Sequence, residues 1–228
     1  MNYINIFLDF FLPRICPSCN QRLDPSERFI CKECTGSLKY TGSKRIESEF
    51  ERKFKDEKLI SGFLPLFVFE KDKELQQIIH SIKYNENFRL GIHLGKLIGE
   101  ELKDHIEKWD ADYFIPVPLH HLKKADRGYN QSYYLSKGIS TITGIPVNRK
   151  TVKRKRYTVS QTSLNLSERK SNMENAFSIR KNSNISGKKI VLVDDVITTG
   201  ATISECARIL KDNGADKIYA LSAAVADF

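Results

Sequence analysis

The stretch Val191-Leu-Val-Asp-Asp-Val-Ile-Thr-Thr-Gly-Ala-Thr202 runs from an apolar segment, through two adjacent acids, into a turn of small residues. The run from Lys189 to Val193 is β-branched and too apolar to alternate, which is typical of a parallel strand buried on both faces. Asp194 and Asp195 follow at the carboxyl end of this strand, where open α/β sheets bind their ligands. The sequence therefore predicts a functional edge on a mainly parallel sheet.

The small residues after the acids predict an anion-binding loop; they are Thr198, Thr199, Gly200, Ala201 and Thr202. Their backbone N–H groups can surround an anion, and a helix that begins near Thr202 directs its positive dipole end to the same point. Paired carboxylates beside such a loop suit a ligand with vicinal hydroxyls and a phosphate, such as a sugar phosphate. No Gly-Lys-Ser/Thr follows, which disfavours a nucleoside triphosphatase. The alternative is an acidic turn that caps a helix of any α/β domain.

The charge of the chain is concentrated in one segment. The chain has 228 residues and a net charge of +9, enough length for one α/β core and a small appendage. Residues 120–170 contain twelve Lys or Arg and only two acids. A localised basic surface indicates an anionic ligand, which is pyrophosphate, nucleic acid or an acidic membrane. For any single lysine, solvated surface charge is the simpler interpretation.

No stretch approaches the roughly 20 uninterrupted apolar residues of a transmembrane helix. The apolar run from Tyr3 to Leu12 contains Asn5 and Asp9 and has no basic region before it, which argues against a signal peptide. We expect a short helix that packs on the body of the protein, with a weak membrane or partner contact as the lesser alternative. The expected location is the cytoplasm, with a peripheral position at the inner membrane as the alternative.

Four of the five cysteines form two Cys-x-x-Cys pairs, Cys16 with Cys19 and Cys31 with Cys34. Each pair predicts a tight turn whose amides face the sulfurs, and two such turns supply four thiolates to a tetrahedral Zn²⁺. Disulfides are the alternative, but they require an oxidising compartment. Because no open coordination position is indicated, we expect a structural zinc.

Period and composition divide the chain into a zinc module at 1–40, a charged connector at 41–60 and an α/β domain at 61–228. Helices are predicted at 73–84, 89–106, 130–142 and 203–213, and strands at 61–70, 112–117, 145–147, 176–179, 190–193 and 217–226. This alternation predicts a mainly parallel sheet with helices on both faces. Gly91, Gly95 and Gly99 recur every four residues, which predicts close packing of that helix against another backbone. Residues 153–175 have no convincing period and predict a long mobile loop.

The 191–202 stretch resembles the phosphoribosyl-pyrophosphate (PRPP) signature of type I phosphoribosyltransferases. The whole chain further resembles the ComF family, phosphoribosyltransferase-like proteins with an N-terminal zinc module that are associated with DNA uptake in natural competence. The motifs that carry this resemblance, with the two Cys-x-x-Cys pairs, are Pro116-Val-Pro-Leu119, Arg127-Gly-Tyr-Asn-Gln-Ser132, Gln161 to Leu166, Arg169 and Asn172 to Phe177. Lys83 also matches a family position, without a role that its chemistry alone assigns.

The resemblance implies a role for each motif. Asp194 and Asp195 are the catalytic acids, which contact the ribose 2′ and 3′ hydroxyls, the latter partly through Mg²⁺ and water, and residues 198–202 hold the 5′-phosphate. The pyrophosphate loop comprises Pro118, Leu119, His120, Lys123 and Arg127. The flexible loop that closes over PRPP comprises Tyr157, Gln161 and Arg169, with a disordered linker as its alternative. For His120, a surface position is an equal alternative, and the segment from Arg127 equally suits a helix start capped by Asn130.

Two functions from different classes follow. The first is a Mg²⁺-dependent, PRPP-binding phosphoribosyltransferase-like protein that acts in DNA uptake; the motifs indicate PRPP binding, and no pattern indicates the acceptor that enzyme activity would need. The second is an accessory factor that binds single-stranded DNA and DNA-uptake proteins, with a regulatory or vestigial PRPP site. Tyrosines among the basic residues support the second function a little. A PRPP-sensing regulator is a third, weaker hypothesis, because the basic residues lack a helix-turn-helix context.

Overall fold

The computed structural model describes residues 13–155, 175–181 and 183–226. Its helices are α2 (Lys32–Gly36), α3 (Ser43–Phe54), α4 (Glu74–Tyr84), α5 (Phe88–Glu107), α6 (His121–Arg127), α7 (Gln131–Thr143) and α9 (Ala201–Asp212). Its strands are β1 (Gly62–Phe69), β2 (Tyr113–Pro116), β3 (Val152–Arg154), β4 (Phe177–Ile179), β5 (Lys189–Ile197) and β6 (Lys217–Ala226).

The main sheet has the strand order β1-β6-β5-β2, and every neighbouring pair is parallel. This arrangement confirms the predicted parallel α/β sheet. Pro65, which has no N–H to donate, lies in β1 at the edge of the sheet. The separate pair of β3 and β4 is antiparallel.

One boundary of the signature strand differs from the prediction. The prediction ended the strand at Val193, but β5 continues to Ile197, and Val196 and Ile197 still pair with Ala224 and Val225 of β6. The two acids therefore lie within the part of β5 that still pairs with β6, near its carboxyl end. Backbone pairing with β6 continues past them because the neighbouring strand is itself long enough to offer partners.

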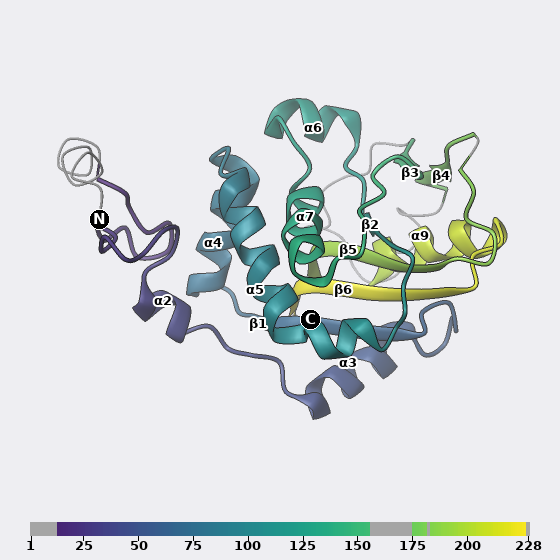
Figure 1. The fold of residues 1–228 in the computed structure, drawn as a ribbon, viewed down its shortest axis with the longest axis horizontal. Coiled ribbons are helices and arrows are strands. Elements are labelled where there is room, and N and C mark those ends of the chain that lie inside the picture. The colour runs from purple at the N-terminus through teal and green to yellow at the C-terminus, as the bar shows by residue number, and fades with distance from the viewer. Residues whose placement is uncertain (1–12, 156–174, 182, 227–228) are drawn as a thin grey trace.

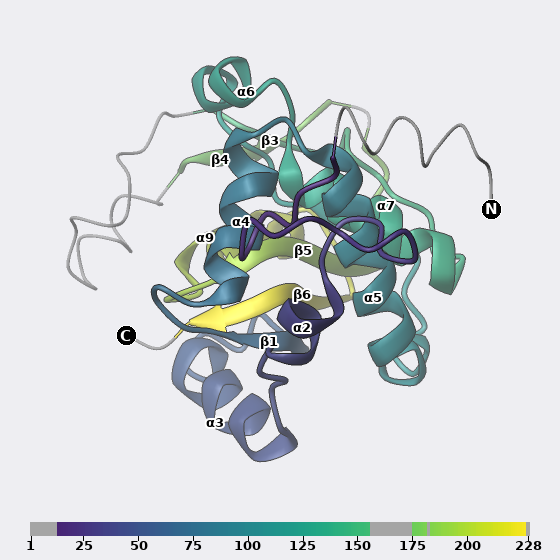
Figure 2. The same ribbon diagram turned by 90° about the vertical axis from the view of Figure 1, so that its left-hand side faces the viewer.

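Two apolar cores cover the two faces of the sheet, so the domain has three layers (Figures 1 and 2). Val191 and Val193 face the core that includes α4, α5 and α7, whereas Ile190 and Leu192 face the core that includes α9 and Phe54 of α3. Because neighbouring residues of a strand point to opposite faces, burial on both sides explains why β5 is a continuous apolar run.

The glycines of α5 allow the close packing that their spacing predicts. A Cβ atom on Gly95 would lie 2.1 Å from the carbonyl oxygen of Leu135 in α7, and one on Gly138 would lie 2.2 Å from the carbonyl oxygen of Ile92. The backbones of α5 and α7 are therefore in direct contact, and a larger residue at either position would separate the helices.

The cysteine-rich segment lies against α4 and α5, at the end of the domain away from α9 (Figures 1 and 2). The Phe29 ring lies 5.2 Å from the His93 ring of α5, and Leu23, Ile30 and Leu38 belong to the same apolar core as α4 and α5. This segment therefore shares its core with the α/β domain.

Some predicted segments differ from the structure. Residues 43–54, inside the expected connector, form α3, and residues 121–127 form α6; neither helix was predicted. At 145–147 the predicted strand is reduced to a single bridge between Val147 and Phe114. The predicted helix at Tyr3 to Leu12 lies outside the described residues. Among the described helices, none combines the length and apolarity needed to span a bilayer.

Candidate functional site

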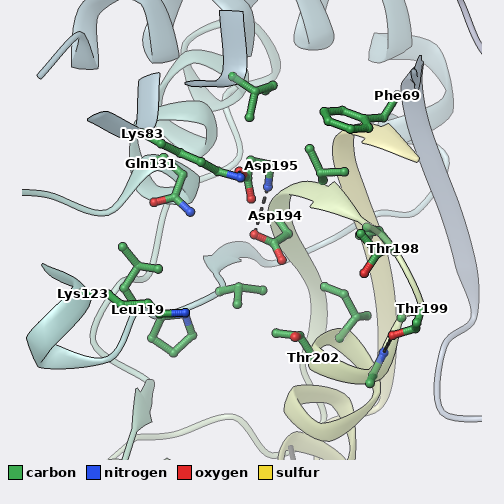
Figure 3. A pocket seen from close by; sticks show the side chains of 18 of the residues that line it. Phe69, Lys83, Leu119, Lys123, Gln131, Asp194, Asp195, Thr198, Thr199 and Thr202 are labelled. Carbon is green, nitrogen blue, oxygen red and sulfur yellow. Dashed lines mark hydrogen bonds and ion pairs between the residues drawn. The ribbon is translucent and has the colours of Figure 1, made fainter. Parts of the chain in front are cut away.

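A cavity of about 570 Å³ opens at the carboxyl edge of the sheet, beyond the ends of β5 and β2 (Figure 3). It is large enough for a small-molecule ligand. The structure brings most of the predicted site residues to its wall; they are Asp194, Asp195, Thr198, Thr199, Gly200, Ala201, Thr202, Pro118, Leu119 and Lys123. Two groups of residues that are 71 to 84 positions apart in the sequence therefore meet at one edge of the sheet.

The two acids have different partners. Asp194 Oδ1 accepts hydrogen bonds from the Ser132 hydroxyl at 3.0 Å and from the backbone N–H of Asp195 at 2.9 Å. Asp195 Oδ2 lies 2.5 Å from Lys83 Nζ of α4 (Figure 3). The 191–202 motif alone named neither partner, because Ser132 comes from α7 and Lys83 from α4, both distant from the motif in the sequence.

These environments move the pKa values of the two carboxyls in opposite directions. Burial, and next the charge of Asp195, raise the pKa of Asp194 to about 8. Burial also raises the pKa of Asp195, but the charge and hydrogen bond of Lys83 outweigh it, so the pKa of Asp195 is lowered. Near neutral pH the pair therefore holds one proton on Asp194 and one negative charge on Asp195, which Lys83 offsets.

The loop after β5 has the backbone geometry of an anion cradle. Gly200 has a φ of +84°, in the left-handed region, and is the N-cap of α9. Thr199 Oγ1 accepts from the N–H of Ala201 at 3.4 Å, and the N–H of Ser204 bonds back to the carbonyl of Gly200 at 2.9 Å. The N-terminal end of α9, with its first backbone amides, therefore lies at the cavity, where the helix dipole favours negative charge.

The predicted pyrophosphate residues divide into two groups. Pro118, Leu119 and Lys123 line the cavity, whereas His120 and Arg127 are not among its lining residues. His120 is buried and caps α6, accepting the N–H of Leu122 at its Nδ1. The guanidinium carbon (Cζ) of Arg127 lies 5.0 Å from the centroid of the Tyr84 ring.

Arg127 also bonds to Gln131 Oε1 at 3.3 Å, and both Tyr84 and Gln131 line the cavity. Arg127 therefore lies behind Tyr84 and Gln131, which separate it from the cavity. Asn130 caps α7 as predicted, with its Oδ1 3.0 Å from the N–H of Ser132.

Two further cations line the cavity, Lys83 of α4 and Arg154 of β3. Burial lowers the pKa of Arg154. Burial also lowers the pKa of Lys123, and the neighbouring charges of Arg154, Arg127 and Lys83 add to this effect. Crowded cations that repel one another are stabilised by an anion placed between them. The sequence places Arg154 in the basic segment but does not indicate that its side chain reaches the cavity. The predicted flexible-loop residues Tyr157, Gln161 and Arg169 lie outside the described residues.

The four paired cysteines lie together. Their Sγ atoms are within 4.8 Å of one another, and Cys19 Sγ is 3.7 Å from Cys31 Sγ. A disulfide requires about 2.05 Å, whereas thiolates about 2.3 Å from a tetrahedral zinc lie about 3.8 Å apart. The N–H of Cys34 points to Cys31 Sγ at 3.4 Å. Against the opposing effect of burial, backbone hydrogen bonds lower the pKa of Cys16 to about 7. The residues present fit a zinc ion in number, type and spacing.

A family model described as "Phosphoribosyl transferase domain" matches residues 131–225. The chain is 34% identical over 63% of its length to "Competence protein F" of Haemophilus influenzae and 32% identical over 62% to "DNA utilization protein YhgH" of Salmonella typhimurium. It is 27% identical over 85% of its length to "Competence protein ComFC" of Streptococcus pneumoniae, covering 86% of that protein.

The chain is thus similar to relatives named for competence and DNA utilisation, and its C-terminal part matches a phosphoribosyltransferase domain, which supports a ComF-like, phosphoribosyltransferase-like protein. The family match confirms the resemblance that the sequence motifs carry, and the parallel sheet confirms the fold class. The chain spans 65% and 63% of the first two relatives' own length, less than two thirds of either. The match to the phosphoribosyl transferase domain begins at Gln131, so α3, α4 and Lys83 lie outside it.

Proposed function

We propose that this protein binds PRPP in the cavity at the carboxyl edge of its sheet. The observation that carries the proposal is the meeting of two buried acids, a glycine-capped helix N-terminus and three cationic side chains around one cavity. Each part suits one part of PRPP: acids suit vicinal hydroxyls, backbone amides suit a terminal phosphate, and clustered cations suit a pyrophosphate.

In this proposal the 5′-phosphate lies on the amides of residues 198–202, and Asp194 and Asp195 orient the ribose. Lys83, Lys123 and Arg154 face the pyrophosphate. Tyr157, Gln161 and Arg169 belong to the loop that closes over the ligand and excludes water. His120 and Arg127 stand behind the pyrophosphate loop, His120 by capping α6 and Arg127 by holding Tyr84 and Gln131.

The same arrangement suits the displacement of pyrophosphate from C1 of PRPP by a nucleophile. The bond from C1 to the pyrophosphate oxygen breaks, the pyrophosphate leaves with the electron pair, and the clustered cations stabilise the charge that develops on it. Release of pyrophosphate in the presence of candidate acceptors tests this step separately from binding.

Mg²⁺ fits the donor set, because Asp195 offers the carboxylate oxygens that it prefers and Asp194 would offer them on releasing its proton. When bound with PRPP, Mg²⁺ supplies positive charge to the phosphate oxygens. The chain contributes Lys83, which already offsets the charge of Asp195 in the unliganded protein.

We further propose that the protein acts in DNA uptake with DNA-uptake proteins as partners, in the cytoplasm, with a peripheral position at the inner membrane as the alternative. The support is the wording of the relatives' names, which refer to competence and to DNA utilisation.

We also propose that Cys16, Cys19, Cys31 and Cys34 hold a structural Zn²⁺. Their segment shares an apolar core with α4 and α5, so loss of the metal should expose that core. We expect one zinc per chain by elemental analysis and a lower Tm after chelation, both absent in a Cys31→Ser plus Cys34→Ser variant. A purified protein that retains no metal and is unaffected by chelation would contradict this assignment.

Thermal shift with PRPP, Mg²⁺, ribose 5-phosphate, pyrophosphate, nucleotides and single-stranded DNA tests the proposed ligand. A ligand that binds only the folded state raises the Tm by mass action. We expect the largest increase with PRPP and Mg²⁺ together. If nucleotides or DNA raise the Tm and PRPP does not, the PRPP proposal is wrong.

One observation favours the second function, binding of single-stranded DNA. Phe88, Tyr129, Tyr133 and Tyr134 form a linked aromatic surface, which we call the aromatic ridge, with ring centroids 5.1 to 6.4 Å apart. The Arg149 guanidinium lies 5.0 Å from the Tyr133 ring centroid. Aromatic rings beside cations stack bases and hold phosphates without sequence preference.

The two functions separate in a salt titration. If the ridge binds single-stranded DNA, affinity should fall steeply with salt, survive Asp194→Ala plus Asp195→Ala, and fall in Phe88→Ala. DNA binding that disappears in the double acid variant would instead assign the DNA to the cavity.

A further inference from the structure

A buried lysine lies directly behind the predicted phosphate loop. The side chain of Lys53, in α3, is 2% exposed, and its Nζ lies 3.0 Å from Glu49 Oε2. The same ammonium donates to the carbonyl of Thr198 and, at 3.3 Å, to the carbonyl of Ala226. Thr198 follows the last residue of β5, and Ala226 is the last residue of β6. Lys53 therefore bridges the carboxyl ends of two neighbouring strands.

The neighbouring residue of α3 packs on the same loop. Phe54 is 2% exposed, and a Cβ atom on Gly200 would lie 2.8 Å from its ring and 3.3 Å from the Cβ of Lys53. Gly200 therefore has two reasons to lack a side chain, its φ of +84° and its contact with α3. Neither Lys53 nor Phe54 is among the residues that line the cavity, so α3 holds the loop from the side away from the ligand.

Peptide geometry gives this contact a consequence for the ligand side. In a planar trans peptide the C=O of one residue and the N–H of the next point in opposite directions. The C=O of Thr198 points to Lys53, behind the loop. The N–H of Thr199 is therefore directed away from α3, towards the cavity that Thr199 lines.

The charge of the ammonium is compensated within α3. Glu49 is 5% exposed and pairs with both Lys53 and Arg52. Because the carboxylate offsets the buried charge, the role of Lys53 at the loop is to set a hydrogen-bond direction and not to attract the ligand from a distance. An ammonium has three N–H donors, which suits it to hold several acceptors at once.

We propose that Lys53 is a positioning residue that fixes the Thr198–Thr199 peptide so that its N–H faces the 5′-phosphate of the ligand. The inference rests on the proposed function for the identity of that ligand. It makes α3, which lies in the segment expected to be a connector, a structural part of the phosphate site.

The test compares two double variants with the wild-type protein. Lys53→Met plus Glu49→Gln removes the brace and avoids leaving Glu49 as an uncompensated buried charge. Lys188→Met plus Asp112→Asn is the matched control, because it removes a lysine–carboxylate pair at the opposite end of β5. Affinities for ribose 5-phosphate and PRPP are measured by calorimetry, and the N–H of Thr199 is followed by NMR.

We expect the Lys53 variant to bind both ligands about tenfold more weakly, since both carry the 5′-phosphate and depend on one oriented amide. The Thr199 N–H resonance should shift in the absence of ligand. The control should lose stability and keep its affinities and the Thr199 resonance.

Two results would overturn the inference, and they differ from failure of the proposed function. Unchanged affinities in the Lys53 variant, with wild-type binding intact, would show that the brace does not position the loop. An unchanged Thr199 resonance would show that the peptide does not depend on Lys53. A wild-type protein that binds neither ligand overturns the proposed function, whereas the NMR comparison still decides whether Lys53 orients the peptide.

Discussion

The two ends of β5 differ in how their acids are paired with lysines. At the amino end, Lys188 Nζ lies 2.8 Å from Asp112 Oδ1 and Lys189 Nζ lies 2.8 Å from Asp110 Oδ2, so each lysine faces one acid at the partly exposed start of the sheet. At the carboxyl end, Asp194 and Asp195 are adjacent and lie beside one cavity, where Lys83 pairs with Asp195.

The pKa values follow from this difference. The hydrogen bond from Lys188, and next that from the Lys189 backbone, lower the pKa of Asp112. Burial and the charge of Asp195 raise the pKa of Asp194 to about 8. Folding stability favours the first arrangement and is reduced by the second. Adjacent buried acids that reduce stability beside a cavity are typical of a ligand-binding or catalytic site. We therefore assign function to the carboxyl end of β5.

The largest effect should come from removing both acids at the carboxyl end. In Asp194→Asn plus Asp195→Asn, side-chain volume is kept but both carboxyl groups are lost, so we expect PRPP affinity to fall about a hundredfold or more. Isothermal titration with Mg²⁺ measures it. Asp110→Asn plus Asp112→Asn at the amino end is the matched control and should bind as the wild type does. Equal losses in the two variants would remove the distinction between the ends.

The next effect concerns Lys83. Lys83→Met leaves Asp195, which is 6% exposed, without its cation. We expect the free energy of unfolding to fall by about 2 kcal/mol, since Lys83 is partly exposed and a fully buried pair would cost more. Urea denaturation at pH 7 measures it. Addition of Asp195→Asn should restore most of the loss, and an additive loss in the double variant would show that the two residues do not interact.

A separate effect should appear in the pH dependence of stability. The carboxyl of Asp194 has a pKa of about 8 in the folded protein and an ordinary value near 3.8 when unfolded. Between these values the folded state binds the extra proton, so the contribution of Asp194 to stability falls as the pH rises from about 4 to about 8.

Asp194→Asn should remove this slope, which unfolding at pH 5, 6, 7 and 8 without ligand measures. Asp112, whose pKa is lowered, contributes in the opposite direction and only at more acidic pH. A variant whose slope equals that of the wild type would show that Asp194 is ionised in the folded protein at neutral pH.

The smallest effect should come from the amino end itself. Lys188→Met removes a pair whose side chains are 39% and 30% exposed, so solvent screens most of its energy. We expect a loss of about 0.5 to 1 kcal/mol by urea denaturation and no change in PRPP affinity. A loss as large as that of Lys83→Met would mean that the two ends contribute alike to stability.

The sequence predicted the parts of this molecule that depend on periodicity. Leu75, Ile78 and Ile82 mark α4, and the glycine spacing anticipated the contact of α5 with α7. It failed to predict α3, because the buried side chains of that helix include the charged Glu49 and Lys53, and the partners of Lys53 at the ends of β5 and β6 are distant in the chain.

The site shows the same division between local and tertiary information. The acids and the Thr198–Thr202 loop are contiguous in sequence and were found from it. Lys83, Ser132 and Arg154 reach the cavity from α4, α7 and β3, and only the fold reveals their direction. His120 and Arg127 were assigned to the pyrophosphate loop from the sequence, but neither lines the cavity. Their positions depend on the conformation of α6, which no local sequence pattern specifies.

The most direct test of the central claim is isothermal titration of PRPP with Mg²⁺ into the wild-type protein and into Asp194→Asn plus Asp195→Asn. The account predicts saturable binding of one PRPP per chain to the wild type and a loss of about a hundredfold or more in the variant. Absence of heat with the wild type, or equal affinity in both proteins, would contradict it.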